Sequence, residues 1–202
     1  MTLHYSAVSS ELISLLKELM SRPELSDFYL VGGTALALRC GHRKSIDLDF
    51  FTGQPFEADP IRGFLEDEYD AQEVTVATNT VLCFIQGIKI DFIAHRYPQI
   101  HKVDTVDEIR LASIADIVAM KLNAIANRGT KKDFWDYALL LESYEKAKLF
   151  ELYTRKYPQA SLWNLEKSLA FFDDAEHQPD PADLRGQTWD QVKRVISDSN
   201  RI

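Results

Sequence analysis

Two aspartates separated by one residue, Asp47 and Asp49, are the side chains of this sequence best suited to chemistry. They lie in the alternating segment of residues 46–50, which predicts a β-strand. The two-residue period of a strand places both carboxylates on one face, roughly 7 Å apart along the backbone. Two acids this close on an apolar strand are costly unless a positive charge lies between them. A divalent cation meets that need, and Mg²⁺ prefers one or two carboxylates together with substrate phosphates.

A segment suited to phosphate binding precedes these aspartates. The apolar run of residues 28–31 predicts a buried strand. Gly32 and Gly33 then predict a tight turn into a helix over residues 34–39. A helix that starts after such a turn exposes unpaired backbone N–H groups, which bind phosphate oxygens.

A third acid, Asp91, lies in a later strand-like segment. Residues 80–85 and 88–93 predict two strands joined by a tight reversal at Gln86-Gly87, hence a β-hairpin. Asp91 is the one acid on the second of these strands. A lone acid on a strand is more often an edge residue that faces solvent, so its position alone does not indicate catalysis.

Candidate phosphate-binding cations follow in the second half of the chain. After Asp107-Glu108 the pattern predicts only helices, and the first runs from Ser113, its expected N-cap, to Arg128. Lys121 lies within the apolar stripe of this helix. Lys121 is therefore either a snorkelling lysine whose stem lies on the core or an inward cation for nucleotide phosphates. Asp133 begins the next predicted helix, where the dipole favours acids, so it could simply be a helix-starting residue beside a surface Lys132.

Length and composition fit a globular chain of one large or two small domains: 202 residues, of which 46% are hydrophobic and 27% charged. No apolar run is long enough for a bilayer span and no secretion signal is visible, so Cys40 and Cys83 are expected to be reduced thiols in a cytoplasmic protein. The net charge of −8 argues against non-specific coating of nucleic acid. Because basic residues gather in the motif segments, we expect a local basic pocket for a nucleotide or for one end of an RNA.

The ordered set of motifs resembles the DNA polymerase β-like nucleotidyltransferase superfamily, and the string GGTALALRCGHRKSIDLDFF is similar to its AbiEii/AbiGii-type toxin branch. Two later strings, DIVAMKLNAI and RGTKKDFWDY, resemble the third and fourth motifs of that family. Together the matches cover roughly residues 28–141. One departure is the Gly-Gly turn, where the wider superfamily commonly has Gly-Ser.

The resemblance implies an α+β fold, with a small mixed sheet flanked by helices and then a helical C-terminal half. We expect a sheet domain over residues 1–110 and a helical domain over residues 111–202. The resemblance also places Asp91 on the strand next to the other two aspartates. Three carboxylates can hold two cations about 3.5–4 Å apart, the arrangement used for in-line phosphoryl displacement.

The function that the resemblance implies is metal-dependent transfer of a nucleoside monophosphate from a nucleoside triphosphate to an acceptor hydroxyl, with one or two Mg²⁺ ions or Mn²⁺ in their place. The implied metal ligands are Asp47, Asp49 and Asp91; the implied catalytic set adds Lys121, Lys132 and Asp133; and the implied nucleotide contacts are Gly32, Gly33, Thr34, Arg43, Ser45, Lys121 and Lys132. Asp136 is expected to be structural, anchoring its loop through Arg128 or backbone N–H groups.

The toxin branch further implies a bacterial toxin–antitoxin or phage-defence setting. An RNA such as tRNA is then one acceptor, and a cognate antitoxin protein is an expected partner. Two alternatives stay open: a kinase-like phosphotransferase on the same scaffold, and a catalytically silent nucleotide-binding module. A metal-dependent phosphohydrolase is disfavoured because no histidine cluster accompanies the acids. Residues 145–157, 161–173 and 188–197 predict three further helices, and the spacing of Thr188 and Gln191 predicts a capping box. We expect the aromatic residues of this part of the chain to pack among these helices: Trp163, Phe171, Phe172 and Trp189. Residues 145–202 indicate no role.

Overall fold

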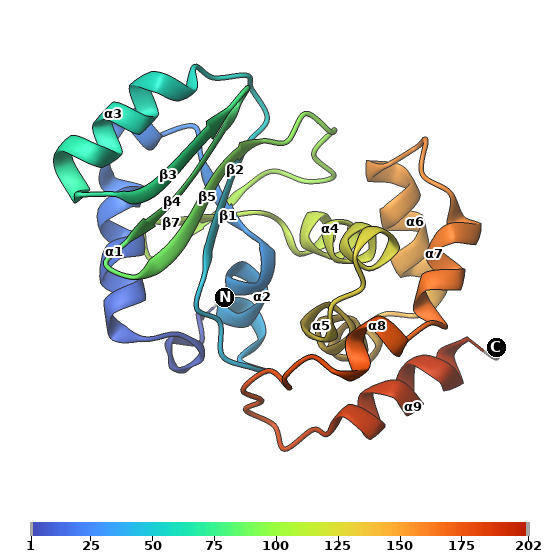
Figure 1. The fold of residues 1–202 in the computed structure, drawn as a ribbon. Helices are drawn as coiled ribbons and strands as arrows, with labels where there is room; N and C mark the ends of the chain where they lie inside the picture. The colour runs from blue at the N-terminus through green and yellow to red at the C-terminus, as the bar shows by residue number, and fades with distance from the viewer. Residues whose placement is uncertain (1, 201–202) are drawn as a thin grey trace.

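One mixed β-sheet carries the predicted acids in the computed structural model, which describes residues 2–200 (Figure 1). The strands are β1 (Tyr29–Val31), β2 (Leu48–Thr52), β3 (Gln72–Ala77), β4 (Thr80–Ile85), β5 (Ile88–Ala94), β6 (Asp104–Val106) and β7 (Ile109–Leu111), in the spatial order β3-β4-β5-β2-β1-β7-β6. The helices are α1 (Ser10–Ser21), α2 (Gly32–Cys40), α3 (Ala58–Tyr69), α4 (Ile114–Asn127), α5 (Lys131–Leu141), α6 (Lys146–Lys156), α7 (Leu162–Leu169), α8 (Asp173–Glu176) and α9 (Trp189–Ser199). The predicted α+β class, with a helical C-terminal half, is confirmed.

Strand β2 lies inside the sheet, antiparallel to β1 and parallel to β5. This pairing sets Asp49 directly beside Asp91. Along β2, Leu48 and Phe50 are buried in the core, and the alternation of a strand turns Asp49 to the opposite face. Since β5 lies between β4 and β2, Asp91 is on an interior strand and not at the edge of the sheet.

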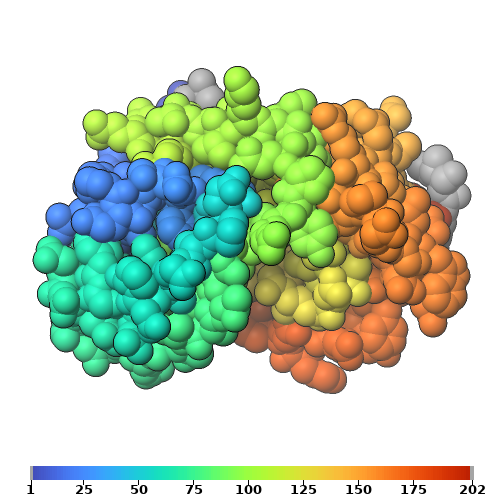
Figure 2. Space-filling view, turned by 90° about the horizontal axis from the view of Figure 1, so that it is seen from above, coloured from blue at the N-terminus to red at the C-terminus, as the bar shows by residue number. Residues whose placement is uncertain are grey.

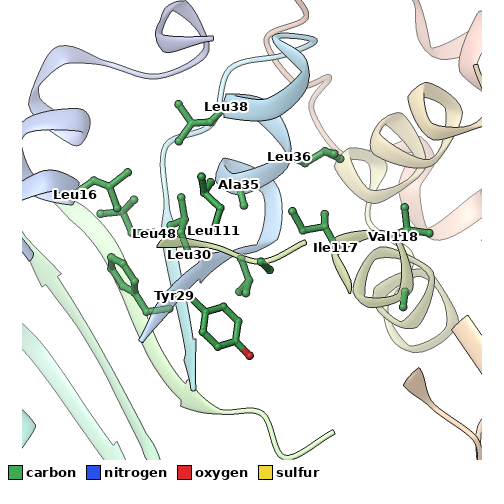
Figure 3. Close-up of a cluster of buried hydrophobic side chains, with 14 of the residues drawn as sticks. Leu16, Tyr29, Leu30, Ala35, Leu36, Leu38, Leu48, Leu111, Ile117 and Val118 are labelled. Carbon is green, nitrogen blue, oxygen red and sulfur yellow. The ribbon is translucent and has the colours of Figure 1, made fainter. Parts of the chain in front are cut away.

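Helices cover both faces of the sheet. In Figure 1, α1 and α3 lie on one side, while α2 and the helical half lie on the other. Figure 3 shows how the strands join these layers through apolar side chains; it labels Leu16 of α1, Tyr29, Leu30, Leu48 and Leu111 of the strands, Ala35, Leu36 and Leu38 of α2, and Ile117 and Val118 of α4. All of these are buried, and their removal from water is the main favourable term that holds the layers together.

Several local predictions are confirmed. Gln86 and Gly87, both with positive φ, form the tight β4–β5 reversal, as predicted. The Ser113 side chain caps α4, accepting from the backbone N–H of Asp116. At the start of α9, Thr188 and Gln191 form the capping box that their spacing predicts.

Other segments differ from the sequence-based expectation. The chain does not turn helical after Asp107-Glu108, because β6 and β7 form a hairpin there and β7 pairs with β1. Each of these strands has three residues, too few to show a period. Helix α2 begins at Gly32 itself, and β2 begins at Leu48, so Asp47 lies just before its strand. The predicted helix over residues 161–173 ends at Leu169, before α8.

The aromatic residues of the C-terminal helices divide into two groups. Phe172 and Trp189 pack edge-to-face, with ring centroids 5.8 Å apart, and both also contact Phe134. Trp163 and Phe171, which we expected to pack among these helices, are 65% and 51% exposed. Within residues 2–200, no helix has the length and apolar character needed to cross a bilayer.

The segment after α8 returns to the sheet half and holds the loop between α2 and β2. The backbone N–H of Lys44 donates to the Ala182 carbonyl at 2.8 Å, and that of Leu184 donates to the His42 carbonyl at 2.9 Å. The indole N–H of Trp135 on α5 donates to Asp183 in the same segment. The loop that carries Arg43 and its neighbours is therefore fixed by the C-terminal part of the chain.

Candidate active site

The glycine turn lies against the carboxylate of Asp49. Gly32 has φ +69°, and a Cβ at this position would be 2.2 Å from Asp49 Oδ2. A Cβ at Gly33 would be 2.7 Å from Arg43 Nη2. Gly32 therefore combines a backbone conformation that favours glycine with an approach so close that a Cβ would displace the Asp49 side chain. The turn brings the first N–H groups of α2 next to the acid pair.

Asp49 and Asp91 form a closely spaced pair of carboxylates. Burial, and then the charge of Asp91, raise the pKa of Asp49. Asp91 Oδ2 accepts from Lys89 Nζ at 2.5 Å. Among the described residues, the buried Oδ1 of Asp91 has no hydrogen-bond partner. The pair thus has one carboxylate oxygen without a hydrogen-bond partner, and an additional positive charge would stabilise its ionised form.

Asp47 has different surroundings. Its backbone carbonyl accepts from the hydroxyl of Thr34, and the Thr34 oxygen in turn accepts from the Ser45 hydroxyl at 2.8 Å. Its carboxylate is 3.7 Å from Lys132 Nζ, a loose pair in which both side chains are partly exposed. Asp47 and Lys132 line a cavity of about 440 Å³, together with Arg43, Lys44, Ser45, Thr130 and residues 178–182.

A second cavity, of about 580 Å³, contains the other two acids. Asp49, Asp91 and Gly32 form its sheet side, while Lys121, Asn123, Asn127 and Arg128 line it from α4 and the residue after it. Phe51, His95, Tyr97 and Tyr157 line it as well. In Figure 2 the yellow surface, which belongs to the region of α4, lies recessed between the green sheet half and the orange helices. The cavity has the size of a small-ligand site.

Asp136 is the centre of a buried group of charges. Arg43 donates to its two carboxylate oxygens from Nε at 2.6 Å and from Nη2 at 2.8 Å. Lys121 Nζ is 2.6 Å from Oδ2, and His42 Nε2 is 2.7 Å from Oδ1. Burial opposes ionisation, yet Lys121 and Arg43 lower the pKa of Asp136 well below its usual value. Asp136 was expected to anchor its loop through Arg128 or backbone N–H groups, but its partners are Arg43, Lys121 and His42, while Arg128 pairs with Asp133.

Asp133 lies beside this group of charges, and Arg128 pairs with Asp133 and not with Asp136. Its carboxylate accepts from Arg128 Nε at 3.0 Å, from the Thr130 hydroxyl at 2.6 Å and from Lys121 Nζ at 3.2 Å. Against the effect of burial, Lys121 and Arg128 lower the pKa of Asp133. A carboxylate with a depressed pKa and three donors is a weak proton acceptor, so this geometry favours a positioning role.

The structure contradicts the snorkelling interpretation of Lys121. Its side chain is 5% exposed, and its Nζ contacts Asp133 and Asp136, so it is an inward cation and not a snorkelling one. Burial lowers the pKa of Lys121, but the two aspartates outweigh that effect and raise it. The predicted basic pocket is thus partly a set of ion pairs, in which Arg43 and Lys121 are already neutralised.

The residues present fit a divalent cation that is shared with a substrate. Within residues 2–200, no three His, Cys, Asp or Glu side chains are arranged to hold a metal ion by themselves. The Asp49–Asp91 pair, with its unpartnered Oδ1, offers hard oxygen ligands. Mg²⁺ typically takes one or two carboxylates and completes its shell with water and phosphate oxygens.

Some site residues were not singled out from the sequence. His42 lies in the motif string and is buried against Asp136, a contact that its neighbour Arg43 could have suggested. Asn123 and Asn127 lie four residues apart and share one face of α4, but the same helical period puts Lys121 on a different face, so the sequence does not connect the asparagines with the site. Tyr97 and His95 follow β5 in a loop, where no periodic pattern marks them.

Comparison with known proteins gives the family. An uncharacterised protein of Aquifex aeolicus is 35% identical to this chain over 169 residues, which cover 81% of this chain and 82% of that protein. Two solved structures share the fold. MenT4, a nucleotidyltransferase toxin of Mycobacterium tuberculosis H37Rv, has a TM-score of 0.60 at 14% identity and covers 95% of this chain and 84% of its own. JHP933 of Helicobacter pylori has a TM-score of 0.54 at 15% identity and covers 96% and 92%. Residues 14–196 match the family described as nucleotidyl transferase AbiEii toxin, type IV toxin–antitoxin system, and the chain belongs to this family of nucleotidyltransferases, as its motifs predicted.

Proposed function

We propose that this protein moves a nucleoside monophosphate from a nucleoside triphosphate to a hydroxyl of an RNA such as tRNA, with Mg²⁺ or Mn²⁺ held by Asp47, Asp49 and Asp91. The observation that carries the proposal is the register of β2 and β5, which sets Asp49 beside Asp91 in a cavity next to the glycine turn. The family supports the reaction class, while the acceptor and the metal ligands are inferences from the site.

The three aspartates have different roles at the reacting centre. When bound, the cation supplies charge stabilisation at the α-phosphate and at the oxygens that attack and leave. Asp49 and Asp91 would hold it from adjacent strands, and we assign Asp47, which lines the neighbouring cavity just before β2, as the third ligand. The free Oδ1 of Asp91 either completes the metal site or receives the proton of the acceptor hydroxyl.

The phosphates of the nucleotide lie at the glycine turn. The backbone N–H groups of Gly32 and Gly33 open α2 and are suited to anionic oxygens. Lys132 makes a 3.7 Å pair with Asp47 and is half-exposed, so it can turn to a phosphate at little cost. Arg43 and Lys121 act mainly through position and field, since both are bound to Asp136.

The two halves of the chain contribute different parts. We assign the carboxylates and the glycine turn to a sheet domain of residues 1–110, and Lys121, Lys132 and Asp133 to a helical domain of residues 111–202. The net charge of −8 fits an enzyme that engages a terminus or a short loop of RNA through few phosphates. The type IV toxin–antitoxin context supports a bacterial cytoplasmic setting and a cognate antitoxin protein as partner.

The test is a labelling experiment with purified protein, Mg²⁺ and bacterial RNA. With α-labelled nucleoside triphosphates, we expect label on the RNA and release of pyrophosphate. Label that arrives only from the γ-position would make the protein a phosphotransferase. No transfer in a sample that binds nucleotide would favour a binding module.

A matched pair of variants connects the activity to the site. Asp49→Asn should abolish transfer, whereas Asp59→Asn, which changes a well-exposed acid on α3, should leave it unchanged. Equal activity of the two variants would contradict the assignment of Asp49.

A further inference from the structure

Four aromatic rings line the cavity that contains the Asp49–Asp91 pair, and the proposed reaction assigns no role to them. They are Phe51, His95, Tyr97 and Tyr157, which we call the aromatic wall. Aromatic rings that line a cavity beside a phosphate-binding turn have the chemistry of a nucleobase site, because every base has a flat face that stacks on them.

The rings of the aromatic wall form a continuous surface. Phe51 and His95 are stacked, with centroids 4.9 Å apart and an interplanar angle of 15°. Tyr97 contacts His95 with a centroid distance of 4.9 Å and Tyr157 with one of 4.7 Å. Of the four, Tyr97 is the most open to solvent, with 51% of its surface exposed. His95 and Tyr157 contact Tyr97 directly, Phe51 stacks on His95, and about half of the Tyr97 surface stays open to solvent.

A buried ion pair fixes the position of the aromatic wall. Lys156, the last residue of α6, is fully buried and donates to Asp116 at 2.7 Å and to the carbonyl of Pro98 at 3.1 Å. Pro98 follows Tyr97 in the chain, and Tyr157 follows Lys156. His95 Nε2 is 3.0 Å from the Tyr157 hydroxyl. The wall is thus held in place before any ligand arrives, which lowers the entropic cost of binding.

The distance from the acids to the aromatic wall suits one nucleoside. Phe51 lies two residues beyond Asp49 on β2, and His95 four residues beyond Asp91, so the wall is about 7–13 Å along the strands from the carboxylates. A nucleotide whose α-phosphate lies at the acids would span this gap with its ribose. We propose that the aromatic wall is the platform for the nucleobase of the nucleoside triphosphate, with Tyr97 stacking on the base.

Charge and cavity shape support the nucleotide over the RNA acceptor as the occupant. Burial, and then the nearby charge of Lys156, lower the pKa of His95 to about 4, so the wall is uncharged at neutral pH and suits a neutral base. The cavity that holds the wall also holds Gly32 and both acids, the predicted phosphate end of the same molecule. The exposed Lys44, a cation suited to an RNA strand, lines the other cavity.

The inference rests on the proposed function, and its test separates the two. We would measure by calorimetry, with Mg²⁺, the binding of non-hydrolysable nucleoside triphosphate analogues and of inorganic triphosphate, which has no base. Tyr97→Ala should weaken nucleotide binding by about 5- to 150-fold, the range for stacking one base on an aromatic ring. Inorganic triphosphate should bind equally to both proteins, and Tyr97→Phe should behave as the wild type.

A matched control is Trp163→Ala, which removes an aromatic side chain of α7 that is 65% exposed. Its nucleotide affinity should equal that of the wild type. If the wild type binds no nucleotide, the proposed function itself fails. If the wild type binds nucleotide and Tyr97→Ala binds it equally well, the platform assignment alone is wrong. If transfer assays show that Tyr97→Ala raises the KM for RNA and not for nucleotide, the wall belongs to the acceptor, and the inference is likewise overturned.

Discussion

The buried carboxylate of Asp136 permits a quantitative prediction, because it holds three basic side chains at once. Asp136→Asn keeps the size of the side chain and removes its charge. Arg43, which is 3% exposed, then loses its bidentate partner, and Lys121 keeps only its 3.2 Å contact with Asp133. Breaking a buried ion pair from one side costs about 3–5 kcal/mol, because an uncompensated charge stays behind. For a chain of this size, that corresponds to a fall of about 6–20 °C in Tm.

The assay is urea unfolding at neutral pH, followed by circular dichroism, with Glu142→Gln as the matched control. Glu142 pairs with Arg185 at 2.9 Å, but both side chains are about half exposed, so this variant should lose less than about 1 kcal/mol. A double-mutant cycle with Lys121→Met should show a coupling of about 0.5–3 kcal/mol between the two positions.

The pH dependence of the same variant has a definite sign. The pKa of Asp136 is lower in the folded protein than its ordinary value of 3.8, so its stabilising effect is present above that value. The wild type should therefore keep its advantage over Asp136→Asn at neutral pH and lose it as the pH falls through the folded-state pKa. If Asp136→Asn costs no more than Glu142→Gln, or if the cycle is additive, the buried network does not hold the site in the way that we infer.

Three further outcomes are expected. In a calorimetric titration with nucleotide, Gly32→Ala should weaken binding by at least about 10-fold, because the added Cβ strains a positive φ and displaces the Asp49 carboxylate. Gly53 has open space around it, so Gly53→Ala should leave the affinity unchanged. Asp49→Asn should raise Tm in EDTA, since it removes a buried charge beside Asp91, and a lower Tm would contradict the repulsion. The pKa of His95 is about 4 in the folded protein and 6.5 ordinarily, so as the pH falls the unfolded state binds a proton before the folded state does. The Tm of the wild type should therefore fall more steeply than that of His95→Phe between pH 6.5 and about 4. Parallel Tm curves for the two proteins would refute this expectation.

Local chemistry and periodicity were enough to identify the elements that carry the acids. Apolar alternation indicated β5 and the strand that begins near Asp47, and the Gln86-Gly87 pair indicated the hairpin, because these features are imposed by neighbours in the sequence. The β6–β7 hairpin was missed because its strands are too short for a period and are stabilised by pairing with β1. The exposure of Trp163 was also missed, since helical spacing does not tell which helix faces are covered.

The ordered motifs of the chain were sufficient for its family and reaction class, because Gly32, Gly33 and the two aspartates after them keep a spacing that a single strand–turn–helix unit dictates. Only the tertiary structure decided which basic side chain pairs with which aspartate. Which aspartate receives Arg43 and which receives Arg128 depends on how α4 and α5 pack, and Asp136 and Asp133 lie three residues apart on one helix face. Likewise, the meeting of Tyr97 and Tyr157 beside Asp91 joins segments about sixty residues apart in sequence, and such a contact follows from packing free energy and from no local pattern.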